Sequence, residues 1–341
     1  MIASRKDDHL RICLQENVRP AHPGTGLDRY RFLHQALPDL NLAQLSLRTA
    51  FLGKELALPF LLSSMSGGTP AARAINRRLA EAAQHLGTAM GVGSQRAGLE
   101  SPDLADTYRV RDVAPDILLL ANLGAVQLNY GYTAEHCQRA VDMIEADALI
   151  LHLNPLQEAI QPGGDTNFAG LLDKIEAVCH AISVPVVAKE VGCGLSAQAA
   201  RQLLDAGVSA LDIAGAGGTS WSEVERQRAH SSLQDRVAAQ FVDWGIPTAQ
   251  SLRLVSGAVP GAPLIASGGI ESGVDVAKCL ALGADLVGFA WPLLRPGMHS
   301  CQAVIEAVEP IAGALRTAMF CIGAPDIAAL QGTPYLEEVQ G

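Results

Sequence analysis

The sequence has few aromatic residues and few charged ones. Aromatic residues make up 4% and charged residues 18% of the 341 positions, whereas an average globular domain is roughly a quarter charged. A core with so few rings has to be built from Ala, Leu, Ile and Val, and the hydrophobic content of 49% supplies enough of them. This composition predicts a globular protein of the α/β class.

An excess of positive charge is also missing. The formal net charge of −10 argues against nucleic acid or an anionic membrane as the main partner, because either would require a broad basic surface. A small anionic ligand remains possible, since a few basic side chains can bind a phosphate locally. The amino-terminal segment provides Arg5, Lys6, Arg11 and Arg19 for that purpose.

Paired cysteines and long apolar runs are absent as well. The seven cysteines include no CxxC pair, which favours reduced thiols over a disulfide framework or a zinc site. The first residues, MIASRKDDHL, contain no apolar stretch typical of a signal peptide, and no run is long enough for a membrane span. We therefore expect a cytoplasmic protein with no membrane partner.

Short apolar runs alternate with helix-length, Ala-rich segments from residue 57 onward, which is typical of repeated βα units. Eight such units predict a closed (β/α)₈ TIM barrel over residues 57–341, covered by an amino-terminal extension of residues 1–56; an open, doubly wound sheet is the alternative. The long polar segment 215–246 suggests an active-site lid. The expected strands span residues 59–64, 88–93, 117–123, 148–154, 185–191, 210–215, 263–269 and 285–290.

The richest polar segment, HLNPLQEAIQPGGDTNF at 152–168, follows the apolar run ALIL directly. The carboxyl end of a parallel strand is where an α/β barrel holds its active site. His152 and Asn154 should project to one side, although a histidine alone is often a satisfied core residue. Glu158, a carboxylate flanked by amides, suits Mg²⁺, which takes few protein oxygens and completes its shell with water and phosphate.

Glycines and single polar residues follow the other strands. Gly268 and Gly269 could present backbone N–H groups to a phosphate, or simply form a tight turn. Lys189 could be the cation that stabilises a reduced flavin, or a structural ion-pair partner. Arg96 could bind a second phosphate, with RKDDH at 5–9 folding over it; a solvated charge run is the plain reading of that stretch.

Taken together, RKDDH, SMSGG, GSQR, HLNPLQEAIQPGGDTNF, KEVGCG, GGTSWSEVE and ASGGI with GADLVG resemble the type 2 isopentenyl-diphosphate isomerases. These FMN-dependent enzymes interconvert isopentenyl and dimethylallyl diphosphate. The resemblance implies Mg²⁺ on Glu158 and FMN bound by Ser64, Met65, Ser66, Ser94, Asn122, Lys189, Thr219, Gly268, Gly269, Ile270, Ala290 and Trp291. It implies substrate contacts from Arg5, Lys6, Ser94, Gln95, Arg96, His152, Asn154 and Gln157.

The chain departs from the family pattern at three positions. Ser66 stands where Thr is usual, Asp8 where Glu is common, and Trp291 where an Arg is usual, which removes one possible phosphate donor. The resemblance further implies that reduced FMN supplies the acid–base function, that NADPH reduces it, and that the chain forms a homo-oligomer, a tetramer or an octamer. Gln157, Trp221 and His152 are then candidates for supporting roles in catalysis, although Trp221 could equally be structural.

Two other functions remain open on the sequence. A 2-hydroxy-acid oxidase is also an FMN barrel, but it should carry a base histidine on a late loop, and His230 lies well past the glycines of GTSWSEVERQRAH. A protein that binds flavin or prenyl diphosphate without catalysis would keep the same motifs.

Overall fold

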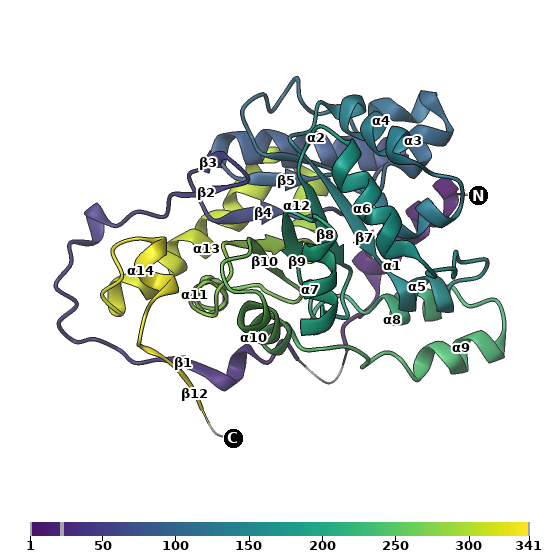
Figure 1. Ribbon diagram of the computed structural model, residues 1–341. Helices are drawn as coiled ribbons and strands as arrows, with labels where there is room; N and C mark the ends of the chain where they lie inside the picture. The colour runs from purple at the N-terminus through teal and green to yellow at the C-terminus, as the bar shows by residue number, and fades with distance from the viewer. Residues whose placement is uncertain (1, 21–23, 340–341) are drawn as a thin grey trace.

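The computed structural model describes residues 2–20 and 24–339, without the side chains of residues 2–5 and 7. Its centre is a closed barrel of eight parallel strands that neighbour one another in chain order (Figure 1). All eight predicted strands are confirmed, and the open-sheet alternative is excluded. The barrel strands are β4 (Phe60–Leu62), β5 (Ala89–Gly91), β6 (Leu119–Gly124), β7 (Ala148–Leu153), β8 (Val186–Glu190), β9 (Ala210–Asp212), β10 (Leu264–Ser267) and β11 (Leu286–Phe289).

Helices surround the barrel, as the repeated βα units predict. The connection from β5 to β6 differs: it holds only the short α3 (Arg96–Glu100) and a 3₁₀ segment, Pro102–Thr107, in place of a full helix. The main outer helices are α2 (Pro70–Leu86), α4 (Ala134–Ile144), α6 (Leu171–Ala181), α7 (Ala197–Asp205), α10 (Thr248–Ala258), α11 (Gly273–Ala281) and α13 (Cys301–Cys321). None of the helices described is both long and apolar enough to cross a membrane.

Alternate strand residues face opposite sides of the barrel wall. Leu61 and Leu120 belong to an apolar cluster inside the barrel. Phe51 of β2 (Thr49–Phe51) and Leu56 of β3 (Lys54–Leu56) are part of the same cluster. Leu119 belongs to the larger cluster between the strands and the outer helices. The β2–β3 hairpin thus contributes apolar side chains to the barrel interior.

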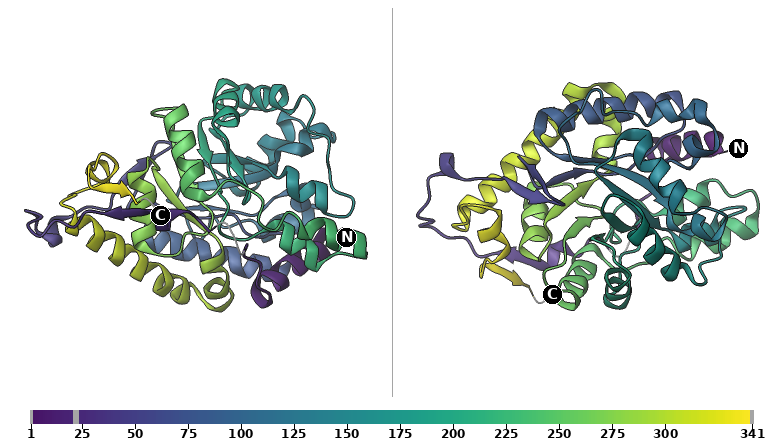
Figure 2. Two further views of the ribbon diagram at one scale, coloured as in Figure 1. Left: turned by 90° about the horizontal axis from the view of Figure 1, so that it is seen from below. Right: turned by 45° about the horizontal axis from the view of Figure 1, so that its top comes forward.

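The amino-terminal extension contacts two distant parts of the molecule. Its first helix, α1 (Ile2–Gln15), packs beside α8 (Trp221–Gln227), as Figure 1 shows. It also contacts α12 (Trp291–His299). Further along, β1 (Tyr30–Phe32) pairs antiparallel with β12 (Leu336–Glu338), so the extension also meets the carboxyl end of the chain (Figure 2). The division of the chain at residue 56 stays a prediction.

The segment expected to be a lid, 215–246, is folded. It contains α8 and α9 (Ser232–Ala239), which pack against each other, and α8 also packs against α5 (Pro155–Ile160). The polar stretch is therefore a helical pair beside the carboxyl ends of the strands, with Trp221 at the start of α8.

Candidate active site

A cavity of about 290 Å³ opens at the carboxyl ends of the barrel strands. Each barrel strand, or the loop that follows it, contributes residues to the wall of the cavity, and α1 adds Lys6 and His9. This is the position at which barrels of this type hold their active sites. The predicted residues that line it are Lys6, Ser64, Met65, Ser66, Ser94, Arg96, Asn122, His152, Asn154, Gln157, Glu158, Lys189, Thr219, Trp221, Gly268, Gly269, Ile270, Ala290 and Trp291.

Gln95, a predicted substrate contact, is not among the residues that line the cavity. Gln95 is fully buried; its amide donates to the Ala140 carbonyl at 2.8 Å and accepts from the Asn122 N–H at 2.9 Å. Its side chain ties α4 to β6 rather than facing a ligand, which corrects the expectation that it contacts phosphate. The side chain of Arg5 lies outside the described residues.

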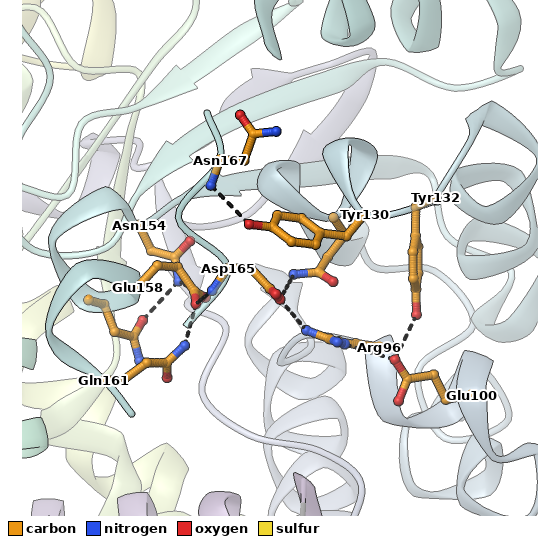
Figure 3. Close-up of polar contacts among 11 residues, drawn as sticks. Arg96, Glu100, Tyr130, Tyr132, Asn154, Glu158, Gln161, Asp165 and Asn167 are labelled. Atoms are coloured by element: carbon orange, nitrogen blue, oxygen red, sulfur yellow. Dashed lines mark hydrogen bonds and ion pairs between the residues drawn. The ribbon is translucent and has the colours of Figure 1, made fainter. Parts of the chain in front are cut away.

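Glu158 is held in place by amide donors. Asn154, which directly follows β7, donates to Oε1 of Glu158 at 2.9 Å, and the Asp165 N–H donates to Oε2 at 2.7 Å. The Gln161 side chain donates to Oε2 as well (Figure 3). Glu158 is buried. The three hydrogen bonds compensate its carboxylate for the loss of water and fix its orientation.

Asn154 also lines the cavity beside Glu158. Its side-chain oxygen, Oδ1, is buried and has no hydrogen-bond partner. A buried acceptor without a donor is costly unless a ligand or water satisfies it. In the part of the chain described, no group of three or more His, Cys, Asp or Glu could hold a metal. The donor set fits a cation that takes one or two protein oxygens and completes its shell elsewhere.

His152 is oriented by its neighbour on β6. Its Nδ1 lies 2.7 Å from Oδ1 of Asn122, whose amide nitrogen donates to the Val92 carbonyl. Because that donation identifies Oδ1 as the acceptor, Nδ1 carries the proton and Nε2 is left as the acceptor nitrogen. Burial lowers the pKa of His152 to about 4, with Lys189 and Lys6 contributing, so the ring is neutral at pH 7.

Lys189 is both a cavity residue and an ion-pair partner. Its Nζ lies 2.7 Å from Oδ2 of Asp212 and 3.3 Å from Oγ of Ser267. Ser267 in turn donates to Oδ1 of Asp212 at 2.6 Å. Sequence reasoning missed Asp212; the signal was a lone acid within the apolar run ALDIAG.

The neighbouring Glu190 shapes the loop after β8. Its Oε2 accepts the backbone N–H groups of Val191, Gly192 and Cys193 at 2.5–2.7 Å. Two of these loop residues, Val191 and Gly192, line the cavity. Burial raises the pKa of Glu190 to about 7 against the opposing effect of those three donors.

Basic residues stand at the mouth, each with protein partners. Lys6 donates to the Ser94 carbonyl at 2.8 Å and to the Tyr108 hydroxyl at 2.7 Å. Arg96 pairs with Glu100 at 2.8 Å and with Asp165 at 2.7 Å (Figure 3). A phosphate ligand would have to share or displace these partners.

Trp221 links the mouth to α1. Its ring lies edge-on to that of His9, with centroids 5.1 Å apart, and His9 Nε2 is 2.9 Å from Oε1 of Glu225. Gln157 lies on the adjacent wall, where its Oε1 accepts from Asn154 at 3.1 Å. Trp221 and Glu225 of α8 thus contact the extension through His9.

The loops after β10 and β11 form the glycine cup, defined as Gly268, Gly269, Ala290 and Trp291. Gly268 and Gly269 have φ angles of 108° and 73°. Residues other than glycine rarely adopt such values. A Cβ at Gly288 of β11 would lie 2.6 Å from the hydroxyl oxygen of Ser63. A side chain at Gly268, Gly269 or Gly288 would collide with neighbouring protein atoms, so the cavity wall here consists of backbone alone.

The chain is similar to known proteins in both its sequence and its fold. Residues 140–337 match the sequence model of the FMN-dependent dehydrogenase family. An isopentenyl-diphosphate delta-isomerase of Nostoc sp. is 51% identical over 99% of this chain and 96% of its own length. The enzyme of that name from Stutzerimonas stutzeri is 54% identical over 98% and 97%.

Solved structures of similar fold are more distant in sequence. A mandelate oxidase variant with benzoylformic acid superimposes with a TM-score of 0.68 at 18% identity, over 99% of this chain and 95% of that one. A lactate oxidase of Pediococcus acidilactici gives 0.65 at 16% identity, over 95% and 89%. These show the shared fold alone. The near full-length identity of about half to the relatives above is decisive: the chain belongs to the type 2 isopentenyl-diphosphate delta-isomerase family, within the FMN-dependent dehydrogenase group.

Proposed function

We propose that this protein interconverts isopentenyl diphosphate and dimethylallyl diphosphate with FMN as its cofactor, Mg²⁺ on the diphosphate and NADPH as the reductant of the flavin. The observation that carries the proposal is the pairing of two features across one cavity. Glu158 and its amides follow β7, and the glycine cup follows β10 and β11, which stand on the opposite side of the barrel.

The residues present fit a flavin phosphate. The positive φ angles of Gly268 and Gly269 let the backbone approach a ligand closely. The Ser63 and Ser64 hydroxyl oxygens are buried without hydrogen-bond partners, as expected of groups that meet a polar ligand. When bound, reduced FMN supplies the acid–base function at the alkene carbons.

The protein residues position the substrate around that chemistry. Glu158 would hold Mg²⁺, which would offset part of the negative charge of the diphosphate, and Lys6 with Arg96 would neutralise the rest. His152, neutral and fixed by Asn122, offers Nε2 as an acceptor without adding a positive charge to the site. Lys189 places a positive charge in the wall of the flavin site, and its ion pair with Asp212 partly neutralises that charge.

The enclosed form of the site supports the reaction as well. Protonation of an unactivated alkene requires a positioned acid and the exclusion of water. The helical pair α8–α9 and the helix α1 pack together at the mouth of the cavity. Gln157 and Trp221 line the cavity near this cover, where they orient the hydrocarbon part of the substrate.

We further propose that the chain assembles as a homo-oligomer, a tetramer or an octamer, in the cytoplasm. Exposed apolar side chains support assembly: Leu233 is 64% and Trp244 is 61% exposed. Light scattering on the purified protein decides the stoichiometry, and a monomer at micromolar concentration would contradict it.

The proposal is tested by a turnover assay. Purified protein receives FMN, NADPH, Mg²⁺ and isopentenyl diphosphate, and the formation of dimethylallyl diphosphate is followed. Conversion that depends on all three additions supports the proposal. Bound FMN without conversion would indicate a binding protein that lacks catalysis.

A 2-hydroxy-acid oxidase is the second candidate, because the similar solved structures include mandelate and lactate oxidases. Such an enzyme needs a base histidine in its cavity from a late loop. His230 is exposed and is not among the residues that line the cavity, which argues against this function. Bleaching of the flavin by lactate or glycolate without NADPH would favour it.

A further inference from the structure

A cation from outside the barrel lies beside the glycine cup. Arg19, which follows α1, lines the cavity together with Glu271 and Trp291. Its guanidinium carbon lies 4.2 Å from the centre of the Trp291 ring, and the guanidinium forms an ion pair with Glu271. The Trp291 N–H donates to the Cys13 carbonyl at 3.1 Å, so the ring on which Arg19 stacks is itself fastened to α1.

A carboxylate, that of Glu271, lies beside the cup, where a phosphate is expected. Left unpaired, Glu271 would repel a phosphate at Gly268 and Gly269, because like charges at short range are unfavourable. Arg19 neutralises Glu271 and has five N–H donors in a fork that matches phosphate oxygens. Trp291 contributes a flat surface but no charge. The other basic residues of the cavity stand elsewhere: Lys6 at Ser94, Arg96 at Asp165 and Lys189 at Asp212.

The chain on both sides of Arg19 is anchored to the barrel. The Val18 carbonyl accepts from the Ser220 N–H at 2.8 Å, and Val18 is buried. Beyond residues 21–23, the Leu27 carbonyl accepts from Lys278 of α11 at 2.9 Å. Arg19 is therefore held beside the cup by neighbours in the segment, rather than reaching it by chance from a loose end.

We infer that Arg19 binds the terminal phosphate of the flavin, and that Glu271 competes with that phosphate for the guanidinium. The inference rests on the FMN binding of the proposed function and assigns a role to a residue of the amino-terminal extension. Because the extension supplies the cation, flavin binding and docking of the extension favour each other.

The test compares FMN with riboflavin, which lacks the phosphate. Dissociation constants of both oxidised flavins are measured by fluorescence quenching for the unmodified protein and for Arg19→Gln and Glu271→Gln. Arg19→Gln should weaken FMN binding about tenfold or more and leave riboflavin within about twofold. Glu271→Gln should tighten FMN binding a few-fold, and this gain should vanish when Arg19→Gln is also present.

Arg253→Gln is the matched control, since Arg253 is an exposed arginine paired with Glu338 and is not among the cavity residues; it should change neither constant. Equal losses for FMN and riboflavin in Arg19→Gln, or no loss, would overturn the inference. A raised KM for isopentenyl diphosphate with unchanged FMN binding would overturn it too, by assigning Arg19 to the substrate. These binding measurements need no turnover, so a failed isomerase assay and a failed Arg19 effect are separate results.

Discussion

The Nζ of Lys189 lies 2.7 Å from Oδ2 of Asp212, and the Asp212 side chain is fully buried. The cation placed in the flavin wall is thus half of a buried pair, with Ser267 bridging both partners. A buried pair of this kind costs desolvation energy when formed and much more when one partner is removed. The pair sets both the charge of the site and the stability of the barrel.

Asp212→Asn should lower the free energy of unfolding by about 3 kcal/mol, because it leaves Lys189 buried without its counter-charge. The measurement is urea unfolding followed by circular dichroism. Asp212→Leu combined with Lys189→Met should lose less, since no charge is left unpaired. Asp103→Asn, at an exposed position, is the control. A double variant as unstable as Asp212→Asn would show that the charge imbalance is not the cause.

Glu158→Gln should raise the Mg²⁺ concentration needed for half-maximal turnover about tenfold, because one anionic oxygen ligand is lost from a site with few of them. The readout is a Mg²⁺ titration of the initial rate. Glu306→Gln on the exposed face of α13 should leave the curve unchanged. An unaltered titration in Glu158→Gln would reject this residue as the metal ligand.

Tyr108→Phe should raise the KM for isopentenyl diphosphate about threefold to tenfold and leave FMN affinity unchanged. The hydroxyl receives a hydrogen bond from Lys6 at 2.7 Å, and a hydrogen bond to a charged group contributes about 1.5–3 kcal/mol. Its loss removes one of the hydrogen bonds that hold the lysine at the cavity wall, beside the one to the Ser94 carbonyl. Steady-state kinetics at saturating FMN, with flavin titration as the second readout, make the comparison. A fall in kcat alone would point to a different role.

Protonation of His152 should destabilise the protein in acid. Its pKa falls from 6.5 to about 4 in the folded state, so the unfolded chain binds more protons between those values. Stability from this group is complete above pH 6.5 and is lost as the pH falls, by at most about 1.4 kcal/mol per pH unit. The difference in unfolding free energy between the unmodified protein and His152→Asn, measured from pH 4 to 8, should shrink toward pH 4. A constant difference would contradict the assignment.

Gln157→Ala and Trp221→Phe should each lower kcat/KM about tenfold or more under reducing conditions, because both side chains position the substrate in an enclosed cavity. Flavin binding should be retained, which a flavin titration checks. Full activity in both variants would remove these two residues from the mechanism.

Much of the fold could be predicted from the sequence because each barrel strand is a local apolar run followed by a polar or glycine signal. Asn122, His152, Lys189 and Gly268 each come directly at or after such a run, and closure of the barrel brings them to one rim. The short α3 was missed because its crossover relies on a 3₁₀ segment that periodicity does not reveal.

The unpredicted part of the site depends on contacts between distant segments. Tyr108 meets Lys6 across 102 positions, and Arg19 stacks on Trp291 from the far end of the chain. Gln95 lies in GSQR, a motif predicted to bind phosphate, yet its side-chain amide donates to a backbone carbonyl of α4. No local pattern reports which of two neighbouring residues faces inward, so the folded chain was needed for each.

The pairing of β1 with β12 has a consequence for the order in which the protein is completed during synthesis. The ribosome releases residues 30–32 long before their partners at 336–338. Until then the extension that carries Lys6, His9 and Arg19 lacks one of its attachments. The extension should therefore be fully attached only after residues 336–338 have been synthesised, and a chain shortened before residue 336 should hold the extension less firmly against the barrel.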